Sequence, residues 1–85
     1  MYKTSIFLSS IESVKNFVAL TSKYDFPISL VTDRYIIDAK SIMGIFSLDL
    51  SKPLKLEVED DGSAEVKEFI GSLDEFKRDK VAVKI

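Results

Sequence analysis

Residues 54–59, Leu-Lys-Leu-Glu-Val-Glu, alternate strictly between apolar and polar side chains, and this alternation limits the possible folds most. Successive side chains of a β-strand point to opposite faces of the sheet, so Leu54, Leu56 and Val58 share one face. An apolar sheet face is stable only when a second layer of structure covers it. The segment therefore predicts one strand of a layered fold that contains a sheet.

Two segments have the spacing of amphipathic helices that would supply such a layer. The first begins near Ser10, where Ser9 and Glu12 have the spacing of a capping box, and ends near Tyr24 because Pro27 disfavours helical geometry at Phe26. The second follows Ser63, a predicted N-cap. The expected apolar faces are Ile11, Val14, Phe17, Val18 and Thr21 in the first helix, and Val66, Phe69, Ile70, Leu73 and Phe76 in the second.

The remaining segments complete an order of strand, helix, strand, strand, short helix, strand and helix. This order predicts a single domain over residues 1–85, an α+β sandwich of two layers with an antiparallel or mixed sheet and helices on one face. Lys80–Ile85 alternates again and is a possible extra edge strand or tail. The other predicted strands are Tyr2–Leu8, Ile28–Thr32 and Tyr35–Ile37, and Ser41 is expected to cap a short helix from Ile42 to about Phe46.

The composition excludes several classes of function. The chain contains no histidine and no cysteine, so we expect no metal site, no thiol chemistry and no disulfide. Its glycines are isolated, which excludes a glycine-rich phosphate loop, and we expect no cofactor. The net charge of −2 with mixed signs argues against nucleic acid as a partner. No apolar run is long enough for a membrane helix and no secretory signal is visible, so the expected location is the cytoplasm.

The run Ala39-Lys40-Ser41-Ile42-Met43, continued by Ile45, Leu48 and Leu50, resembles a motif of HPr, the histidine-containing phosphocarrier of the bacterial sugar phosphotransferase system. The likeness extends from about Asn16 to the end of the last helix, roughly three quarters of the chain. It implies the HPr-like βαββαβα fold, an open-faced sandwich of a four-stranded antiparallel sheet with three helices on one face.

The resemblance also reveals a departure at the family's active site. By position, Ser10 stands where the family has its phosphorylated histidine, and Glu12 stands where it has an arginine. A phosphoserine is a stable ester that would retain the phosphoryl group, and Glu12 would repel the incoming dianion. We therefore expect that the protein is not an enzyme and has no catalytic residues. Ser9 and Ser10 are expected to cap a helix.

Ser41 corresponds to the serine that is a regulatory phosphorylation site in many members of the family. A helix N-terminus favours negative charge, and Lys40 lies next to it in the sequence. A phosphate here would add about −1.5 to −2 units of charge beside an apolar cluster. Two interpretations remain open, because the role of an ordinary N-cap is by itself enough to explain a serine at this position.

The apolar cluster that follows is Ile42, Met43, Ile45 and Phe46, and on one short helix these four side chains cannot all face inward. HPr-like proteins dock partners on this face, so Lys40, Ile42, Met43, Ile45 and Phe46 form the expected partner surface. In the alternative interpretation three of the four apolar residues are core and the fourth is incidentally exposed. Leu48 and Leu50 are expected in the core.

The sequence thus predicts a non-catalytic HPr-like protein that acts by binding proteins, with Ser41 as the candidate position for a phosphorylation switch. Expected partners are phosphotransferase components, a kinase or a transcription regulator, and the expected state is a monomer or a weak homodimer. Two alternatives stay open. The chain could be a phosphoryl carrier that uses serine in place of histidine, or a structural, oligomerising module whose resemblance is only ancestral.

Overall fold

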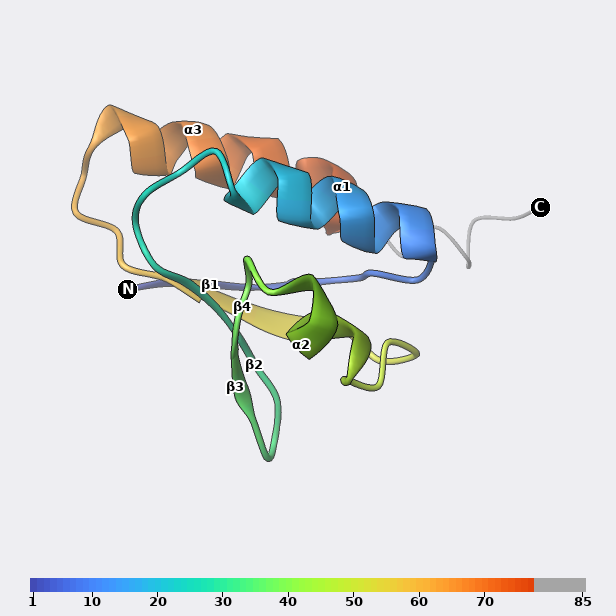
Figure 1. Cartoon of the computed structure of the whole chain (residues 1–85). Helices are drawn as coiled ribbons and strands as arrows, with labels where there is room; N and C mark the ends of the chain where they lie inside the picture. Colours follow the sequence, from blue (N-terminus) through green and yellow to red (C-terminus); the bar gives the residue numbers. More distant parts are fainter. Residues whose placement is uncertain (78–85) are drawn as a thin grey trace.

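The computed structural model describes residues 1–77, and the predicted strand or tail at Lys80–Ile85 lies outside the described residues. Four strands form one sheet in the order β1-β4-β2-β3, and every neighbouring pair is antiparallel (Figure 1). The sheet is therefore antiparallel and not mixed. The strands are β1 (Tyr2–Ile6), β2 (Ile28–Val31), β3 (Ile36–Asp38) and β4 (Leu54–Val58).

The alternating segment that predicted a strand is β4, which lies inside the sheet between β1 and β2. Leu54, Leu56 and Val58 are buried on one face, as the alternation predicted. The opposite face carries polar side chains, and there the Lys3 ammonium of β1 lies 3.9 Å from the Glu57 carboxylate of β4. One face of the sheet thus borders the core while the other is open, which confirms the predicted two-layer, open-faced architecture.

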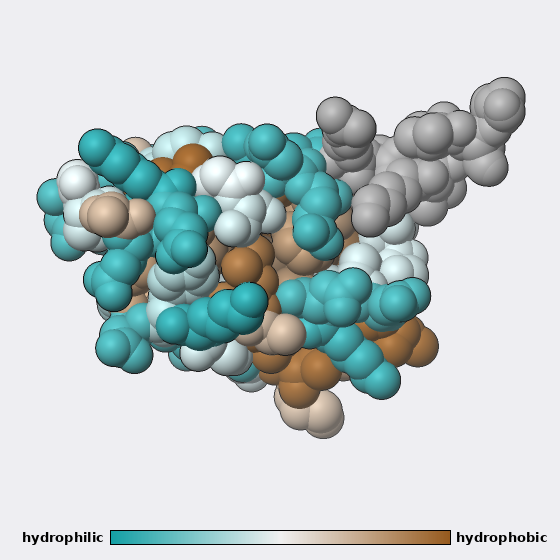
Figure 2. Space-filling view, turned by 90° about the horizontal axis from the view of Figure 1, so that it is seen from above, coloured by the Kyte–Doolittle hydropathy of each residue, from teal (hydrophilic) through white to brown (hydrophobic). Residues whose placement is uncertain are grey.

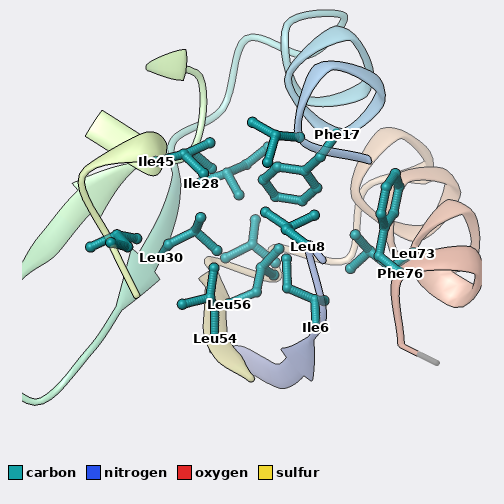
Figure 3. Close-up of a cluster of buried hydrophobic side chains, with 14 of the residues drawn as sticks. Ile6, Leu8, Phe17, Ile28, Leu30, Ile45, Leu54, Leu56, Leu73 and Phe76 are labelled. Carbon is teal, nitrogen blue, oxygen red and sulfur yellow. The ribbon is translucent and has the colours of Figure 1, made fainter. Parts of the chain in front are cut away.

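Two helices cover the apolar face of the sheet, as Figure 1 shows: α1 (Ile11–Thr21) and α3 (Ala64–Ser72). A 3₁₀ turn, η1 (Leu73–Phe76), continues α3, and the short α2 (Ile42–Phe46) contacts α1 and β3. The order βαββαβα is therefore confirmed. Side chains from the strands and from all the helical segments meet in one buried cluster, part of which is drawn in Figure 3.

The start of α1 differs in detail from the prediction. The N-cap is Ser10, and its capping-box partner is Ser13, so the predicted pairing of Ser9 with Glu12 is wrong. Sequence spacing allows both pairs, and the choice depends on which serine has extended backbone angles. Ile11 is 65% exposed, so its predicted place on the buried face is also wrong; Val14, Phe17 and Thr21 are buried as predicted. The helix ends at Thr21, earlier than predicted.

The first strand is shorter than predicted because its end bonds to another element. β1 stops at Ile6, and the Phe7 N–H donates to the Phe76 carbonyl of η1 at 2.7 Å. In the hairpin, the Thr32 N–H donates to the Tyr35 carbonyl at 2.8 Å, which makes Tyr35 part of the turn and starts β3 at Ile36. None of the helices formed by residues 1–77 has the length and apolar character needed to cross a bilayer.

Candidate functional site

The first candidate region is the N-terminus of α1, where Ser10 is the N-cap. Its hydroxyl accepts the Ser13 N–H at 3.0 Å, while the Ser13 hydroxyl accepts the Ser10 N–H at 3.0 Å and donates to the Ser10 carbonyl at 2.8 Å. Each serine therefore satisfies a backbone group of the other, as a capping box does. The Ser10 hydroxyl has a structural role in starting the helix, which is the role predicted for it.

A hollow of about 410 Å³ lies beside this cap, and its charged groups are carboxylates. Glu12 from α1 and Glu75 from η1 line it together with Ser10, Ser13 and Asn16. Neither lysine nor arginine is among its lining residues in the described part of the chain. Among the described residues that line this hollow, a phosphoryl dianion would meet two like charges and no cation, which is unfavourable.

The second candidate region is the N-terminus of α2. Ser41 is exposed, and its hydroxyl accepts the Gly44 N–H at 3.2 Å, so the predicted N-cap is present. The preceding residue, Lys40, is half-buried, and its N–H donates to the Asp38 carboxylate at 2.9 Å. Together these bonds hold the connection between β3 and α2 in one conformation and present the Ser41 side chain to solvent.

The four apolar residues of α2 divide between core and surface. Met43 is 77% exposed and Phe46 is 41% exposed, whereas Ile42 is half-buried against the core. Ile45 is completely buried, so its predicted place on the partner surface is wrong. The helix packs that side chain next to Ile28, as Figure 3 shows, and burial of an isoleucine there is more favourable than exposure.

The exposed members of this group, Met43 and Phe46, present large apolar side chains to solvent. Figure 2 shows hydrophobic side chains along the lower edge of the view, on the side of the molecule where α2 lies in Figure 1. We call the set Lys40, Ser41, Ile42, Met43 and Phe46 the α2 surface. It combines one hydroxyl, one ammonium group and an adaptable apolar contact area, since methionine and aromatic side chains accommodate different partners. Leu48 is in the core as predicted, and Leu50 packs partly buried against it.

Two contacts that position α2 were not predicted from the sequence. A Cβ atom on Gly44 would lie 2.8 Å from Ile37 Cγ2, so any other residue at position 44 would force α2 or the Ile37 side chain to shift. The buried Thr21 hydroxyl donates to the Ala39 carbonyl at 3.1 Å, which ties the end of α1 to the segment before α2. A glycine inside a predicted helix was the available signal for the first contact.

Other parts of the described chain offer no comparable site. A hollow of about 600 Å³ between the β2–β3 hairpin and the loop before β4 carries charges of both signs, from Asp33, Arg34, Asp49, Lys52 and Lys55. Within residues 1–77 no buried side-chain nitrogen or oxygen lacks a hydrogen-bond partner, and no group of acidic side chains is placed to hold a metal ion.

An antiparallel β1-β4-β2-β3 sheet with three helices and a capped α2 beside an apolar surface defines the class of HPr-like open-faced sandwiches. Comparison with known proteins gives the family. The family model described as the phosphorylation site of the HPr component of the phosphotransferase system matches residues 13–77. The chain therefore belongs to the HPr family of the phosphotransferase system.

Solved structures agree with this assignment. HPr-C-His from Thermoanaerobacter tengcongensis is 30% identical, with 88% of this chain and 92% of that chain covered and a TM-score of 0.67. The phosphocarrier protein HPr from Bacillus anthracis str. Ames is 20% identical, with 91% and 96% covered and a TM-score of 0.59, and this match shows the fold alone. No curated protein matches the chain.

Proposed function

We propose that this chain is a non-catalytic member of the HPr family that works in the cytoplasm by binding proteins through the α2 surface. The observation that carries the proposal is the exposure of Met43, 77%, and Phe46, 41%, directly after the capping serine of α2. Large apolar side chains that remain this exposed on one short helix are typical of a contact surface.

The geometry around Ser10 argues against the competing role of a phosphoryl carrier. The resemblance places Ser10 at the position of the family histidine, and the family model begins its match only at Ser13. The Ser10 hydroxyl is engaged in the capping box, and Glu12 and Glu75 line the adjacent hollow. A phosphoserine formed there would be a stable ester between two carboxylates, with no cation from the hollow to stabilise it.

Ser41 is the proposed regulatory position on the α2 surface. Its exposed hydroxyl is accessible to a kinase, and a phosphate oxygen could take over the bond from the Gly44 N–H. Phosphorylation would place about −1.5 to −2 units of charge next to Met43 and Ile42. An apolar contact beside a dianion loses affinity for an apolar or acidic partner and gains affinity for a basic one, which makes the surface switchable.

The family assignment supplies the class of partner. Candidates are phosphotransferase components, an HPr kinase or a transcription regulator from the same cell. The resemblance supports protein partners in general, and the exposed methionine and phenylalanine on α2 support an interface with an apolar centre. Lys40 lies at the border of this centre, where a charge contributes to orientation and association rate.

A mass measurement tests the absence of carrier activity. The protein is incubated with phosphoenolpyruvate and the first enzyme of the phosphotransferase system, and its intact mass is then measured. We expect an unchanged mass, while an authentic histidine-containing HPr in the same mixture gains one phosphoryl group. A phosphoryl group that appears on Ser10 and passes on to an acceptor would overturn the proposal.

A binding experiment tests the α2 surface with a matched control. Met43→Asp places a charge at the proposed centre, and Ile11→Asp makes the same change at a side chain of α1 with comparable exposure, 65%. The probes are purified phosphotransferase proteins, HPr kinase and sugar-responsive regulators, titrated by calorimetry. We expect Met43→Asp to weaken the binding of a probe by at least about tenfold and Ile11→Asp to leave it unchanged. Equal effects of the two changes, or no binding by any probe, would contradict the proposal.

A further inference from the structure

Strand β3 forms an outer edge of the sheet among the described residues, and it is not covered by another strand there. Ile37 of this strand packs partly buried against the core, whereas its neighbour Ile36 faces solvent. Ile36 is 75% exposed and Tyr35, just before the strand, is 57% exposed. Figure 1 shows that the β2–β3 hairpin projects from the body of the molecule, away from α1 and α3. A second strand therefore has room to approach this edge.

The pairing of β3 with β2 fixes the direction of its backbone groups. Directly opposite residues in an antiparallel pair alternate between bonded and non-bonded pairs. The Ala39 N–H donates to the Ile28 carbonyl and the Thr32 N–H donates to the Tyr35 carbonyl, so these pairs are bonded. By alternation, the pairs of Ile36 with Val31 and of Asp38 with Ser29 are not bonded to each other. The N–H and C=O groups of Ile36, and the N–H of Asp38, point toward the outer edge.

This edge is complementary to itself. An antiparallel copy placed with Ile36 opposite Ile36 lets each Ile36 N–H donate to the Ile36 carbonyl of the other copy. In the same register the Asp38 end of each β3 lies beside the hairpin turn of the other copy, which carries Arg34. The two-fold axis is perpendicular to the sheet, so the open faces of the two copies lie on the same side. The cross-strand pair Val31–Ile36 of one copy then lies next to the same pair of the other copy.

The charges at the two ends of the strand agree with the same register. Arg34 precedes the strand and Asp38 ends it, and both are exposed. Within residues 1–77 neither side chain forms an ion pair. Asp38 uses one carboxylate oxygen to accept the Lys40 N–H at 2.9 Å, and its second oxygen is not used in that bond. Pairing Ile36 with Ile36 brings each Arg34 opposite Asp38 of the other copy, twice in one dimer. In many proteins, charged side chains at a sheet edge prevent pairing with a second sheet by repulsion. Here opposite charges would face each other across the edge and attract.

We propose that two copies of this chain associate through the outer edges of β3, with Ile36 at the two-fold axis and Arg34 opposite Asp38. The two four-stranded sheets then join into one continuous sheet. Because the strand is short, the interface is small and the dimer dissociates on dilution. This interface lies on a different element from the proposed α2 surface, so either proposal can fail without the other.

A charge-exchange experiment tests the register. In Arg34→Asp, both copies carry acids at the two ends of the strand, and in Asp38→Arg both carry arginines, so each variant alone has two repulsive pairs. Mixing the two variants restores two attractive pairs in a heterodimer. Sedimentation equilibrium of the full chain, at concentrations up to about 1 mM, measures the weight-average mass. We expect the wild type and the mixture to rise above the single-chain mass of 9.6 kDa, and each variant alone to remain at it.

Two further variants make the outcome decisive. Ile36→Lys, at an exposed position where the fold does not depend on the side chain, is expected to abolish the dimer. Lys15→Asp on exposed α1 changes the net charge by the same amount as Arg34→Asp, and is expected to dimerise like the wild type. A wild type that stays monomeric overturns the proposal. Dimers that persist in Ile36→Lys, or a mixture no heavier than its two components, overturn it as well.

Discussion

Gly44 of α2 lies so close to Ile37 of β3 that a Cβ atom on residue 44 would come within 2.8 Å of Ile37 Cγ2. The same Cβ atom would lie 3.1 Å from the Ser41 hydroxyl oxygen, which accepts the Gly44 N–H. One missing side chain therefore permits both the packing of α2 against the sheet and the cap that presents Ser41. The position of the α2 surface depends on this contact.

Gly44→Ala is expected to destabilise the protein even though alanine is the better helix former. Forcing a methyl group into this space costs about 1–3 kcal/mol, and the gain in helix propensity of about 1 kcal/mol offsets part of that cost. Gly71→Ala is the control, because a Cβ atom at this exposed position of α3 meets no atom within 4 Å. Urea unfolding should show a loss for Gly44→Ala and a gain of up to about 1 kcal/mol for Gly71→Ala. A Gly44→Ala protein as stable as the wild type would show that Ile37 moves freely.

Thr21→Val is expected to cost about 1–3 kcal/mol although it conserves the shape of the side chain. The Thr21 hydroxyl is buried and donates to the Val18 and Ala39 carbonyls, both at 3.1 Å. Valine would leave the Ala39 carbonyl in the core without this donor. Thermal unfolding measures the loss, and Thr21→Ser, which keeps the hydroxyl, is expected to lower the melting temperature less. Equal losses in the two variants would assign the effect to the methyl group instead.

Ile45→Ala and Met43→Ala separate the buried side of α2 from its exposed side. Ile45 has no exposed surface, so removing its side chain leaves a cavity and costs about 2–5 kcal/mol. Met43 is 77% exposed, and its truncation should change the free energy of unfolding by less than about 0.5 kcal/mol. Chemical denaturation of both variants checks the difference. Similar values would mean that α2 is not docked as the structure places it.

Stability is expected to be nearly constant between about pH 5 and pH 9 and to fall at lower pH. The chain has no histidine to titrate in that range. Two carboxyl groups determine the behaviour at acid pH. The pKa of Asp49 is lowered by hydrogen bonds from Ser51, mainly from its hydroxyl, and the pKa of Asp61 is lowered by a hydrogen bond from the Ser63 N–H. A carboxyl with a lowered pKa stabilises the fold above its ordinary value of 3.8, and this contribution is lost as the pH falls through the lower folded value.

The alkaline limit follows from two other groups. The hydrogen bond of the Lys77 ammonium to the Tyr2 hydroxyl, 2.9 Å long, raises the pKa of Lys77, and burial raises the pKa of Tyr24. A raised folded pKa gives stability that is complete below the ordinary value and is lost as the pH rises through the folded value. The free energy of unfolding, measured from pH 3 to pH 11, should therefore decrease above about pH 10. Tyr2→Phe should reduce this decline and Tyr35→Phe should not; a stability that stays constant up to pH 11 would contradict this expectation.

Much of the fold was predictable because its signals are local. The alternation of Leu54, Leu56 and Val58 needs no knowledge of the neighbouring strands, and the caps Ser41 and Ser63 stand directly before apolar periodicity. The choice between Ser9 and Ser10 was not predictable in this way. Both have a polar residue three positions later, and only the backbone angles of Ser10 decide between them.

The candidate site was predictable in its position but not in its orientation. A five-residue helix shows that Met43 and Ile45 face different ways, yet which of them faces inward depends on Ile28 and Phe17, which are distant in the sequence. The hollow beside Ser10 was missed for the same reason, since Glu75 reaches it from the far end of the described chain. The β3 edge needed the strand pairing, because only the register shows that the backbone N–H groups of Ile36 and Asp38 point away from β2.

The hydrogen bond from Phe7 to Phe76 has a consequence for biosynthesis. β1 has no partner until β4 has been made, and the residue after β1 bonds to η1 near the end of the described chain. A nascent chain leaving the ribosome can form α1 early, but its first strand waits for almost the whole polypeptide to emerge. Truncation at either end of the described chain removes a partner of this bond, so we expect β1 and η1 to reach their final positions at the same stage of folding.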